Sequence, residues 1–127
     1  RRSQFQVFVM PNLYGDIITD EAAQIQGGVG TAGSANIGDR YAMFEAIHGS
    51  APRMIEEGIG EYANPSSIFK AVEMMLRHIA MTKQADKLAQ AMEICNESEK
   101  KVVVTGNRDG ATCAAFADYV METIRKL

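Results

Sequence analysis

Two aspartates, Asp16 and Asp20, stand four positions apart in a stretch whose apolar residues recur with helical spacing. On a helix this spacing places both carboxylates on one face, within about 6 Å of each other. Mg²⁺ and Mn²⁺ prefer one or two such carboxylates together with water and substrate oxygens. The alternative is an exposed acidic pair in the first turns of a helix, where the helix dipole stabilises negative charge. The pair alone leaves both interpretations open.

A glycine-rich segment, Gly28-Val-Gly30-Thr-Ala-Gly33, has the letters of the dinucleotide fingerprint G-x-G-x-x-G. In a Rossmann fold that motif follows a strand, opens a helix and precedes an acidic residue by about twenty positions. Here a predicted helix comes before it, no helical periodicity follows it, and the residue twenty positions beyond Gly33 is Arg53. The segment therefore predicts a loop and argues against a Rossmann domain.

A second candidate site is the run His48-Gly-Ser-Ala-Pro-Arg53. Gly49, Ser50 and Ala51 are small enough for backbone amides to approach an anion, and the arginine is a planar cation suited to phosphate. The alternative is a polar loop with a hydrogen-bonded histidine and a solvated arginine. Just upstream, Glu45 interrupts an apolar stretch, which predicts a buried partner or a ligand for its carboxylate.

Hydrophobic periodicity and breaker residues predict the elements that position these side chains. Strands are expected at 5–10, 41–47 and 102–105, loops at 27–39 and 48–63, and helices at 16–26, from Asn64-Pro65 to about 79, at 83–99 and from Thr112 onward. This order predicts an α/β fold with too few strands for a complete doubly wound sheet. We expect the sheet to continue in residues outside this sequence.

The composition excludes several classes of protein. With 127 residues, 46% of them apolar, and a formal net charge of -3, the chain suits one globular core and lacks the basic character of a nucleic-acid or anionic-membrane binder. The sequence has no long apolar run for a membrane segment or a signal peptide, so a cytoplasmic location is expected. Cys95 and Cys113 are too far apart in sequence to suggest a zinc site or a disulfide framework. The abrupt start on Arg1 and a strand is expected of a piece of a longer chain.

Five sequence blocks together resemble the metal-dependent β-decarboxylating dehydrogenases, the family of isocitrate and isopropylmalate dehydrogenases. These blocks are Met10-Pro-Asn-Leu-Tyr-Gly-Asp-Ile-Ile-Thr-Asp20, Gly27-Gly-Val-Gly30, Gly33-Ser-Ala-Asn-Ile-Gly38, Phe44-Glu-Ala-Ile-His-Gly-Ser-Ala-Pro52 and Asn64-Pro65. The resemblance covers nearly the whole chain but only about the C-terminal third of a family member. The run Met74-Met-Leu-Arg-His78 favours the isocitrate branch.

The resemblance implies the organisation of the chain. Residues 1–40 would belong to the smaller, dimer-forming domain with the metal-binding helix, and residues 41–127 to the larger cofactor-binding domain. The family's acid-base catalytic residues and substrate arginines would lie upstream, so no catalytic residue is expected here and the chain should not catalyse on its own. The expected partners are a 2-hydroxy-diacid substrate and a second copy in a homodimer or larger homo-oligomer.

The resemblance also implies the roles of individual residues. Asp16 and Asp20 fall on family metal ligands for Mg²⁺ or Mn²⁺, which would polarise the substrate and stabilise the enolate left by loss of CO₂. The implied cofactor-binding residues are Ile37 and Glu45 near the nicotinamide, Asn64 at the adenine, and His48, Gly49, Ser50, Ala51 and Arg53 around the adenosine.

Arg53 follows Ala-Pro, the position at which family members distinguish the two cofactors, and its positive charge favours NADP over NAD. The stretch from Arg53 to Asn64 is longer than is usual in the family, and Met54 departs from the usual residue type. Arg108 is the alternative partner of the NADP phosphate, and NAD the alternative cofactor.

The implied reaction is NAD(P)-dependent oxidative decarboxylation of isocitrate to 2-oxoglutarate. Within the family the alternative substrate is isopropylmalate or another 2-hydroxy-diacid. A non-catalytic regulatory subunit of the same fold is a further alternative. The retention of both Asp16 and Asp20 argues against it, because a regulatory subunit has no need of a metal site.

Overall fold

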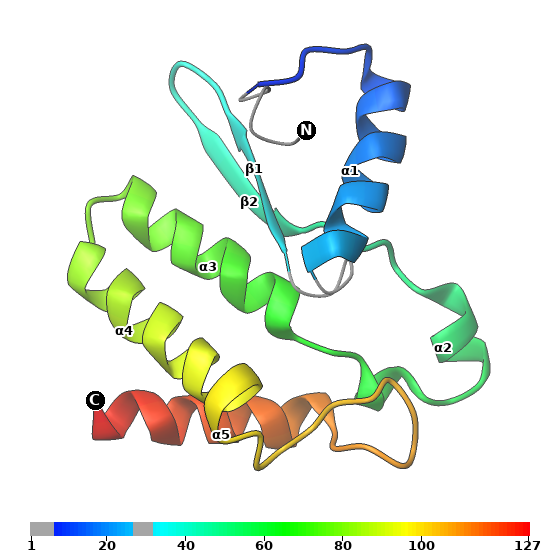
Figure 1. The fold of residues 1–127 in the computed structure, drawn as a ribbon, viewed down its shortest axis with the longest axis vertical. Helices are drawn as coiled ribbons and strands as arrows, with labels where there is room; N and C mark the ends of the chain where they lie inside the picture. Colours follow the sequence, from blue (N-terminus) through cyan, green and yellow to red (C-terminus); the bar gives the residue numbers. More distant parts are fainter. Residues whose placement is uncertain (1–6, 27–31) are drawn as a thin grey trace.

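The computed structural model describes residues 7–26 and 32–127. Its elements, in chain order, are α1 (Asn12–Gln26), β1 (Gly33–Ile37), β2 (Ala42–Ala46), α2 (Pro52–Glu56), the 3₁₀ helix η3 (Gly60–Tyr62), α3 (Ser66–His78), α4 (Thr82–Glu93), the π-helical turn η4 (Ile94–Ser98) and α5 (Cys113–Lys126). Figure 1 shows a stack in which α3 lies between the β1–β2 hairpin and α4, with α5 beyond α4. The helices α1 and α2 stand apart from this stack.

The two strands form an antiparallel hairpin in which Gly33 pairs with Ala46 and Ile37 with Ala42. Along β2, half-buried and exposed residues alternate, so Ala42, Phe44 and Ala46 face α3 while the other two residues face outward. The hairpin packs very closely on the helix, because a Cβ placed on Gly33 would lie 2.6 Å from the backbone nitrogen of Ala71. A residue without a side chain is required at this contact.

The core lies between the helices of the stack. Phe116 and Val120 of α5 pack against Leu88 and Ala91 of α4 and against Cys95 of η4. From α3, Phe69, Val72 and Leu76 complete the cluster as partly buried neighbours. Each buried apolar side chain of this kind contributes roughly 1.5–3 kcal/mol to folding. This helical core supports α3, against which the hairpin and the candidate site are placed.

The helical predictions for the second half of the chain are confirmed. The helix expected at 83–99 is observed as α4 continued by η4, with Ala85, Leu88 and Cys95 buried as its spacing predicted. The Thr112 side chain accepts a hydrogen bond from the backbone nitrogen of Ala115, 3.2 Å, and so caps α5. At the start of α3, Asn64 Oδ1 accepts from the backbone nitrogen of Ser66, 2.9 Å, although the helix begins one residue later than predicted.

Three predictions about strands and loops are wrong. The described part of the strand expected at 5–10 is not a strand, and Val9 is 94% exposed with no paired neighbour strand among residues 7–26 and 32–127. Residues 102–105 keep the alternation of a strand, but they form no ladder in the described part of the chain, and Val103 O instead accepts from Ala111 N, 2.8 Å. Conversely, Gly33–Ile37 is a strand where a loop was expected, because its small residues fit closely against α3. Residues 27–31 of that expected loop, with most of the fingerprint-like segment, lie outside the described residues.

The helix α1 begins four residues earlier than predicted. Pro11 O accepts a hydrogen bond from the backbone nitrogen of Gly15, 3.0 Å, so the helix starts directly after Pro11 and runs through the glycine that the sequence suggested as a boundary. The first turn consequently contains no acidic residue. The explanation of Asp16 and Asp20 as dipole-stabilised first-turn residues is therefore weakened, because that effect falls off within one turn.

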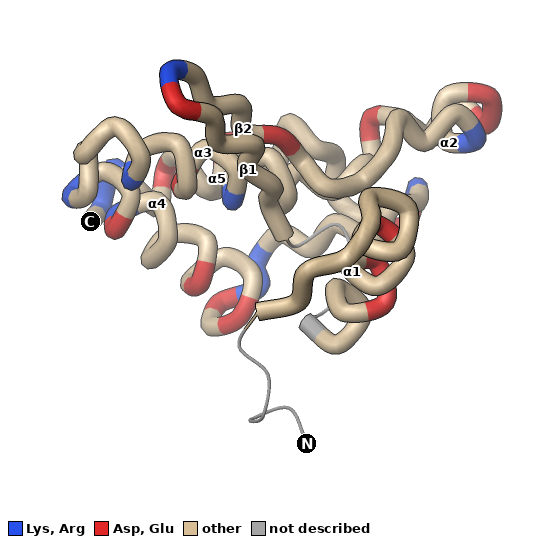
Figure 2. Tube along the Cα trace, turned by 90° about the horizontal axis from the view of Figure 1, so that it is seen from above, with Lys and Arg blue, Asp and Glu red and all other residues tan. Residues whose placement is uncertain are grey.

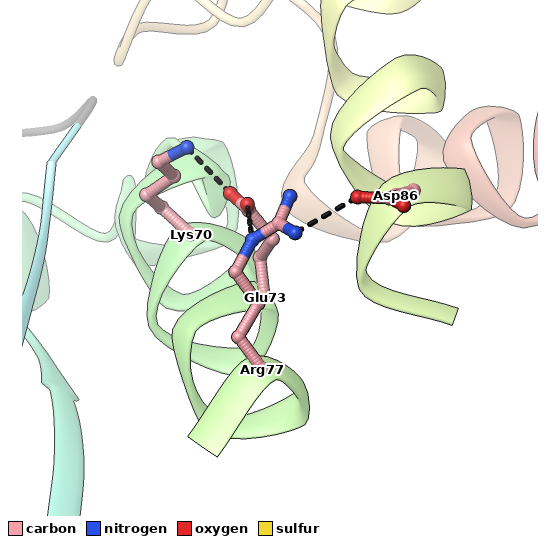
Figure 3. A network of polar contacts seen from close by, with 4 residues as sticks. All are labelled: Lys70, Glu73, Arg77 and Asp86. Carbon is pink, nitrogen blue, oxygen red and sulfur yellow. Dashed lines mark hydrogen bonds and ion pairs between the residues drawn. The ribbon is translucent and has the colours of Figure 1, made fainter. Parts of the chain in front are cut away.

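One polar cluster joins α3 to α4 (Figure 3). The Glu73 carboxylate, 7% exposed, accepts hydrogen bonds from Lys70 Nζ at 2.5 Å and from Arg77 Nε at 2.8 Å. The same guanidinium reaches across to Asp86 of α4, with Nη1 2.8 Å from Oδ1. Burial raises the pKa of the Glu73 carboxyl, but the hydrogen bonds and charges of Lys70 and Arg77 outweigh this effect and hold the pKa below its ordinary 4.5. The ionised form of Glu73 therefore stabilises the fold.

This cluster predicts a loss of stability in acid. A carboxyl whose pKa is lowered by folding contributes its stabilisation fully above the unfolded value of 4.5, and the contribution disappears as the pH falls through the lower folded value. Since Lys70 and Arg77 are partly exposed and screened, we expect Glu73→Gln to cost about 1 kcal/mol at pH 7. Urea unfolding at pH 7 and at pH 3 checks this. The difference between wild type and variant should shrink at pH 3, and a constant difference would contradict the assignment.

Acidic and basic residues both occur along the described helices of the stack, whereas α1 carries acidic residues only, as Figure 2 shows. Within residues 7–26 and 32–127, no helix combines the length and the apolar character needed to cross a membrane.

Candidate functional site

A cavity of about 600 Å³ opens beside the start of α3. Five of the residues predicted to bind the cofactor line it, namely His48, Gly49, Ser50, Ala51 and Asn64. They come from two segments, one that follows β2 and one that precedes α3, and the packing of the hairpin on α3 brings them together. This cavity, here called the adenosine cavity after its predicted ligand, is the candidate site.

The local geometry of both segments is well defined. A carbonyl only accepts, so in the 3.0 Å contact between His48 Nδ1 and Gly49 O the ring nitrogen donates to the carbonyl. Ala51 adopts a left-handed backbone, φ 48° and ψ 57°, which is strained for a residue with a Cβ. Opposite, Asn64 is half-buried and its Oδ1 is engaged by the Ser66 backbone, so its side-chain amide is held in one place.

The rest of the cavity wall was not predicted. Met54, Ile55, Gly60 and Ala63 lie within the long loop expected at 48–63, which the structure resolves into α2 and η3. Gly106 comes from the turn before α5, with φ 81°, and only the fold brings it to the site. Its turn chemistry was visible in the sequence, but the long-range contact was not. These residues give the cavity largely apolar walls.

Arg53 does not line the cavity. Its Nε donates to Glu57 Oε1, 2.6 Å, along one face of α2, and its side chain is 86% exposed. The i,i+4 spacing of Arg53 and Glu57 favours such an ion pair on a helix, although the sequence motif assigned Arg53 to the cofactor. Arg108 does not line the cavity either; it follows the lining residue Gly106 by two positions, and its Nη2 would lie 3.9 Å from a Cβ placed on Gly58.

The structure places Ile37 and Glu45 away from the adenosine cavity and apart from each other. The strand register puts them on opposite faces of the hairpin, where Ile37 pairs with Ala42 near the turn and Glu45 pairs with Ser34 near the other end. Of the two alternatives for Glu45, a buried partner is wrong: Glu45 lies on the outward face of β2, where its Oε1 accepts from the exposed Asn36 Nδ2 at 3.0 Å, and a ligand stays a prediction. Both side chains are exposed.

Asp16 and Asp20 are both exposed and lie one turn apart on α1. In the described part of the chain neither has a basic partner, and no three His, Cys, Asp or Glu side chains come together to hold a metal ion. Two adjacent carboxylates fit a divalent cation that takes its other ligands from water and substrate. The described residues supply only these two carboxylates, so an ion held there would take its further oxygen ligands from elsewhere.

Comparisons with known proteins agree with the motifs. The family model "Isocitrate/isopropylmalate dehydrogenase" matches residues 1–120. An isocitrate dehydrogenase (NADP) of Rickettsia bellii is 44% identical over 124 residues, 97% of this chain and 25% of the relative. A 3-isopropylmalate dehydrogenase of Methanothermobacter thermautotrophicus is 43% identical over 71% of this chain and 26% of the relative.

A solved structure agrees as well. The crystal structure of isocitrate dehydrogenase from Methylococcus capsulatus superimposes with a TM-score of 0.81 at 36% identity, over 97% of this chain and 36% of that one. The chain thus spans between 25% and 36% of the length of these relatives. Its sequence blocks and its fold both match, and the chain belongs to the isocitrate/isopropylmalate dehydrogenase family.

Proposed function

We propose that this chain is the C-terminal part of an NADP-dependent isocitrate dehydrogenase, which oxidises and decarboxylates isocitrate to 2-oxoglutarate in the cytoplasm. The observation that carries the proposal is the adenosine cavity, in which His48, Gly49, Ser50, Ala51 and Asn64 meet. The sequence motifs alone imply a common ligand for these residues, and the fold brings them to one cavity. Similar proteins of Rickettsia are named isocitrate dehydrogenase (NADP), which supports isocitrate as the substrate and NADP as the cofactor.

The adenosine half of the cofactor would occupy the cavity. Met54 and Ile55 offer apolar surface to a purine ring, and the fixed amide of Asn64 can bond the edge of adenine. The small residues Gly49 to Ala51 leave room for the ribose and its phosphates to approach the backbone. The nicotinamide half would then extend out of the cavity toward Glu45, three residues before His48, whereas Ile37 lies on the opposite face of the hairpin.

Two arginines, Arg53 and Arg108, are candidates for binding the 2′-phosphate of NADP. Arg53 would have to exchange Glu57 for the phosphate, a change that its exposure permits. Arg108 would need no such exchange, since it forms no ion pair within the described residues and lies two positions after Gly106 of the cavity wall. Either guanidinium can bind a phosphate through two parallel hydrogen bonds.

Asp16 and Asp20 would hold Mg²⁺ or Mn²⁺. Such an ion, when bound, would polarise the carbonyl group formed when the substrate hydroxyl is oxidised. It would then stabilise the negative charge that develops on the same oxygen during decarboxylation. The contribution of this chain is to present two carboxylates one turn apart on a helix that stands clear of the helical stack.

The domain boundary near residue 40 also stays a proposal. The β1–β2 hairpin spans it, so this hairpin would connect the part that holds the metal to the part that holds the cofactor. On α1, Leu13, Tyr14, Ile17 and Ile18 are exposed, which supports the proposal that this helix packs against a second copy in a homodimer.

Calorimetric titration of the chain with NADP⁺ and with NAD⁺ tests the proposed cofactor. We expect tighter binding of NADP⁺, and about a tenfold loss of NADP⁺ affinity on replacing the arginine that holds the phosphate by alanine, with NAD⁺ affinity unchanged. Arg53→Ala and Arg108→Ala decide between the two, and Arg125→Ala, on the distant end of α5, is the control. Equal affinity of the wild type for both cofactors would contradict the NADP assignment.

A further inference from the structure

Ser67 lies in the first turn of α3 and is fully buried, with 0% exposure. Its hydroxyl makes two hydrogen bonds to backbone atoms far away in sequence. It donates to Ala32 O and accepts from Ile47 N, the latter at 3.1 Å. A buried hydroxyl with one donor bond and one acceptor bond to two separate segments is fully committed to holding them.

The two bonded atoms are the two ends of the hairpin. Ala32 directly precedes β1, and Ile47 directly follows β2 and precedes His48 of the adenosine cavity. Three residues before Ser67, Asn64 forms the opposite side of the same cavity. One hydroxyl thus joins the segment that carries His48 to Ala51 with the segment that carries Asn64.

Other contacts between the hairpin and α3 are less directional. Apart from Ser67, the recorded contacts in the described residues are close packing, as at Gly33 and Ala71, and the tilted ring pair of Phe44 and His78, whose centroids lie 5.4 Å apart. Packing keeps the hairpin on the helix but permits small sliding movements, whereas hydrogen bonds fix a direction and a distance. Packing at Gly33 therefore holds the hairpin against α3, and the hydrogen bonds of Ser67 fix its direction and hence the spacing of the cavity walls.

We propose that Ser67 is a positioning residue of the adenosine cavity, acting through Ile47 to set the place of His48–Ala51 relative to Asn64. This inference rests on the proposed function, because it assumes that the cavity binds adenosine. Ser67 touches no ligand in this scheme. Its effect is to keep the empty cavity in the shape that the ligand requires, so that binding needs no reordering.

The test compares Ser67→Ala with Thr123→Val in the full chain. Thr123 is also a buried hydroxyl, but it lies on α5, donates to Tyr119 O at 2.9 Å and is remote from the cavity lining. Both variants should lower the melting temperature. Only Ser67→Ala should weaken binding of adenosine 2′,5′-bisphosphate, by about tenfold, measured by calorimetry well below both melting temperatures.

The outcomes separate the two proposals. If the wild type binds and Ser67→Ala binds equally well, or if Thr123→Val weakens binding as much, the role of Ser67 is overturned and the cavity assignment stands. If the wild type does not bind, the cavity assignment is overturned and the role of Ser67 with it. Should Ser67→Ala fail to fold, Ser67→Cys, similar in size but a weak hydrogen-bonding group, takes its place with the same expected direction.

Discussion

Replacing Gly33 with alanine is expected to lower the free energy of unfolding by at least about 3 kcal/mol. The added Cβ would lie 2.6 Å from the nitrogen and 2.9 Å from the Cα of Ala71. These are backbone atoms in the middle of α3, at a residue that is itself buried, so no side chain can move aside. The hairpin would have to shift away from the helix, and His48–Ala51 would move with it.

Urea unfolding monitored by circular dichroism measures this effect, with Gly49→Ala as the matched control. A Cβ on Gly49 meets nothing within 4 Å, and the backbone there needs no left-handed conformation, so the control should stay within about 0.5 kcal/mol of the wild type. A Gly33→Ala protein as stable as the control would show that β1 does not pack on α3 as described.

Replacing Asp16 and Asp20 together with asparagine is expected to abolish binding of Mn²⁺ to α1. Each substitution removes a negative charge and leaves a neutral oxygen, which is a much weaker ligand for a hard cation, so the pair should lower the affinity at least about a hundredfold. The exposure of both side chains means that the change should leave the fold intact. The predicted result is therefore a loss of binding without a loss of stability.

Paramagnetic broadening of amide resonances by Mn²⁺ detects even weak binding and identifies where the ion lies. In the wild type the broadening should centre on α1, and in the double variant it should vanish. Glu21→Gln serves as control, because Glu21 is an exposed acid beside Asp20 on another face of the helix. Persistent broadening at α1 in the double variant, or equal loss in the control, would contradict the metal assignment.

The sequence predicted those elements whose pattern is decided by their own residues. The apolar stripe of α5, with Phe116 and Val120, and that of α4, with Leu88, fixed both helices and their buried faces. β1 could not be predicted, because Gly33 to Asn36 have low strand propensity and the strand exists through its fit against α3. The prediction of a strand at 102–105 was wrong for the converse reason. These residues have high strand propensity, but no strand pairs with them within the described residues.

The candidate site divides in the same way. The residues that motifs identified, His48 to Ala51 and Asn64, do meet in one cavity. Gly106 could not be predicted as a site residue. It reaches the cavity only because the turn before α5 folds against the segment between β2 and α3. The motif position of Arg53 predicted that it binds the cofactor. The i,i+4 spacing of Arg53 and Glu57 instead favours an ion pair on a helix, and the structure shows that ion pair. Contacts between distant segments were the part that a single sequence could not supply.

The central claim is that the adenosine cavity binds the adenosine end of NADP, and chemical-shift mapping of the chain with NADP⁺ tests it most directly. On saturation, the amide resonances of Gly49, Ser50, Asn64 and Gly106 should shift, while those of the C-terminal turns of α5 should not. Unchanged cavity resonances at millimolar NADP⁺, or shifts confined to surfaces outside the cavity, would contradict the account.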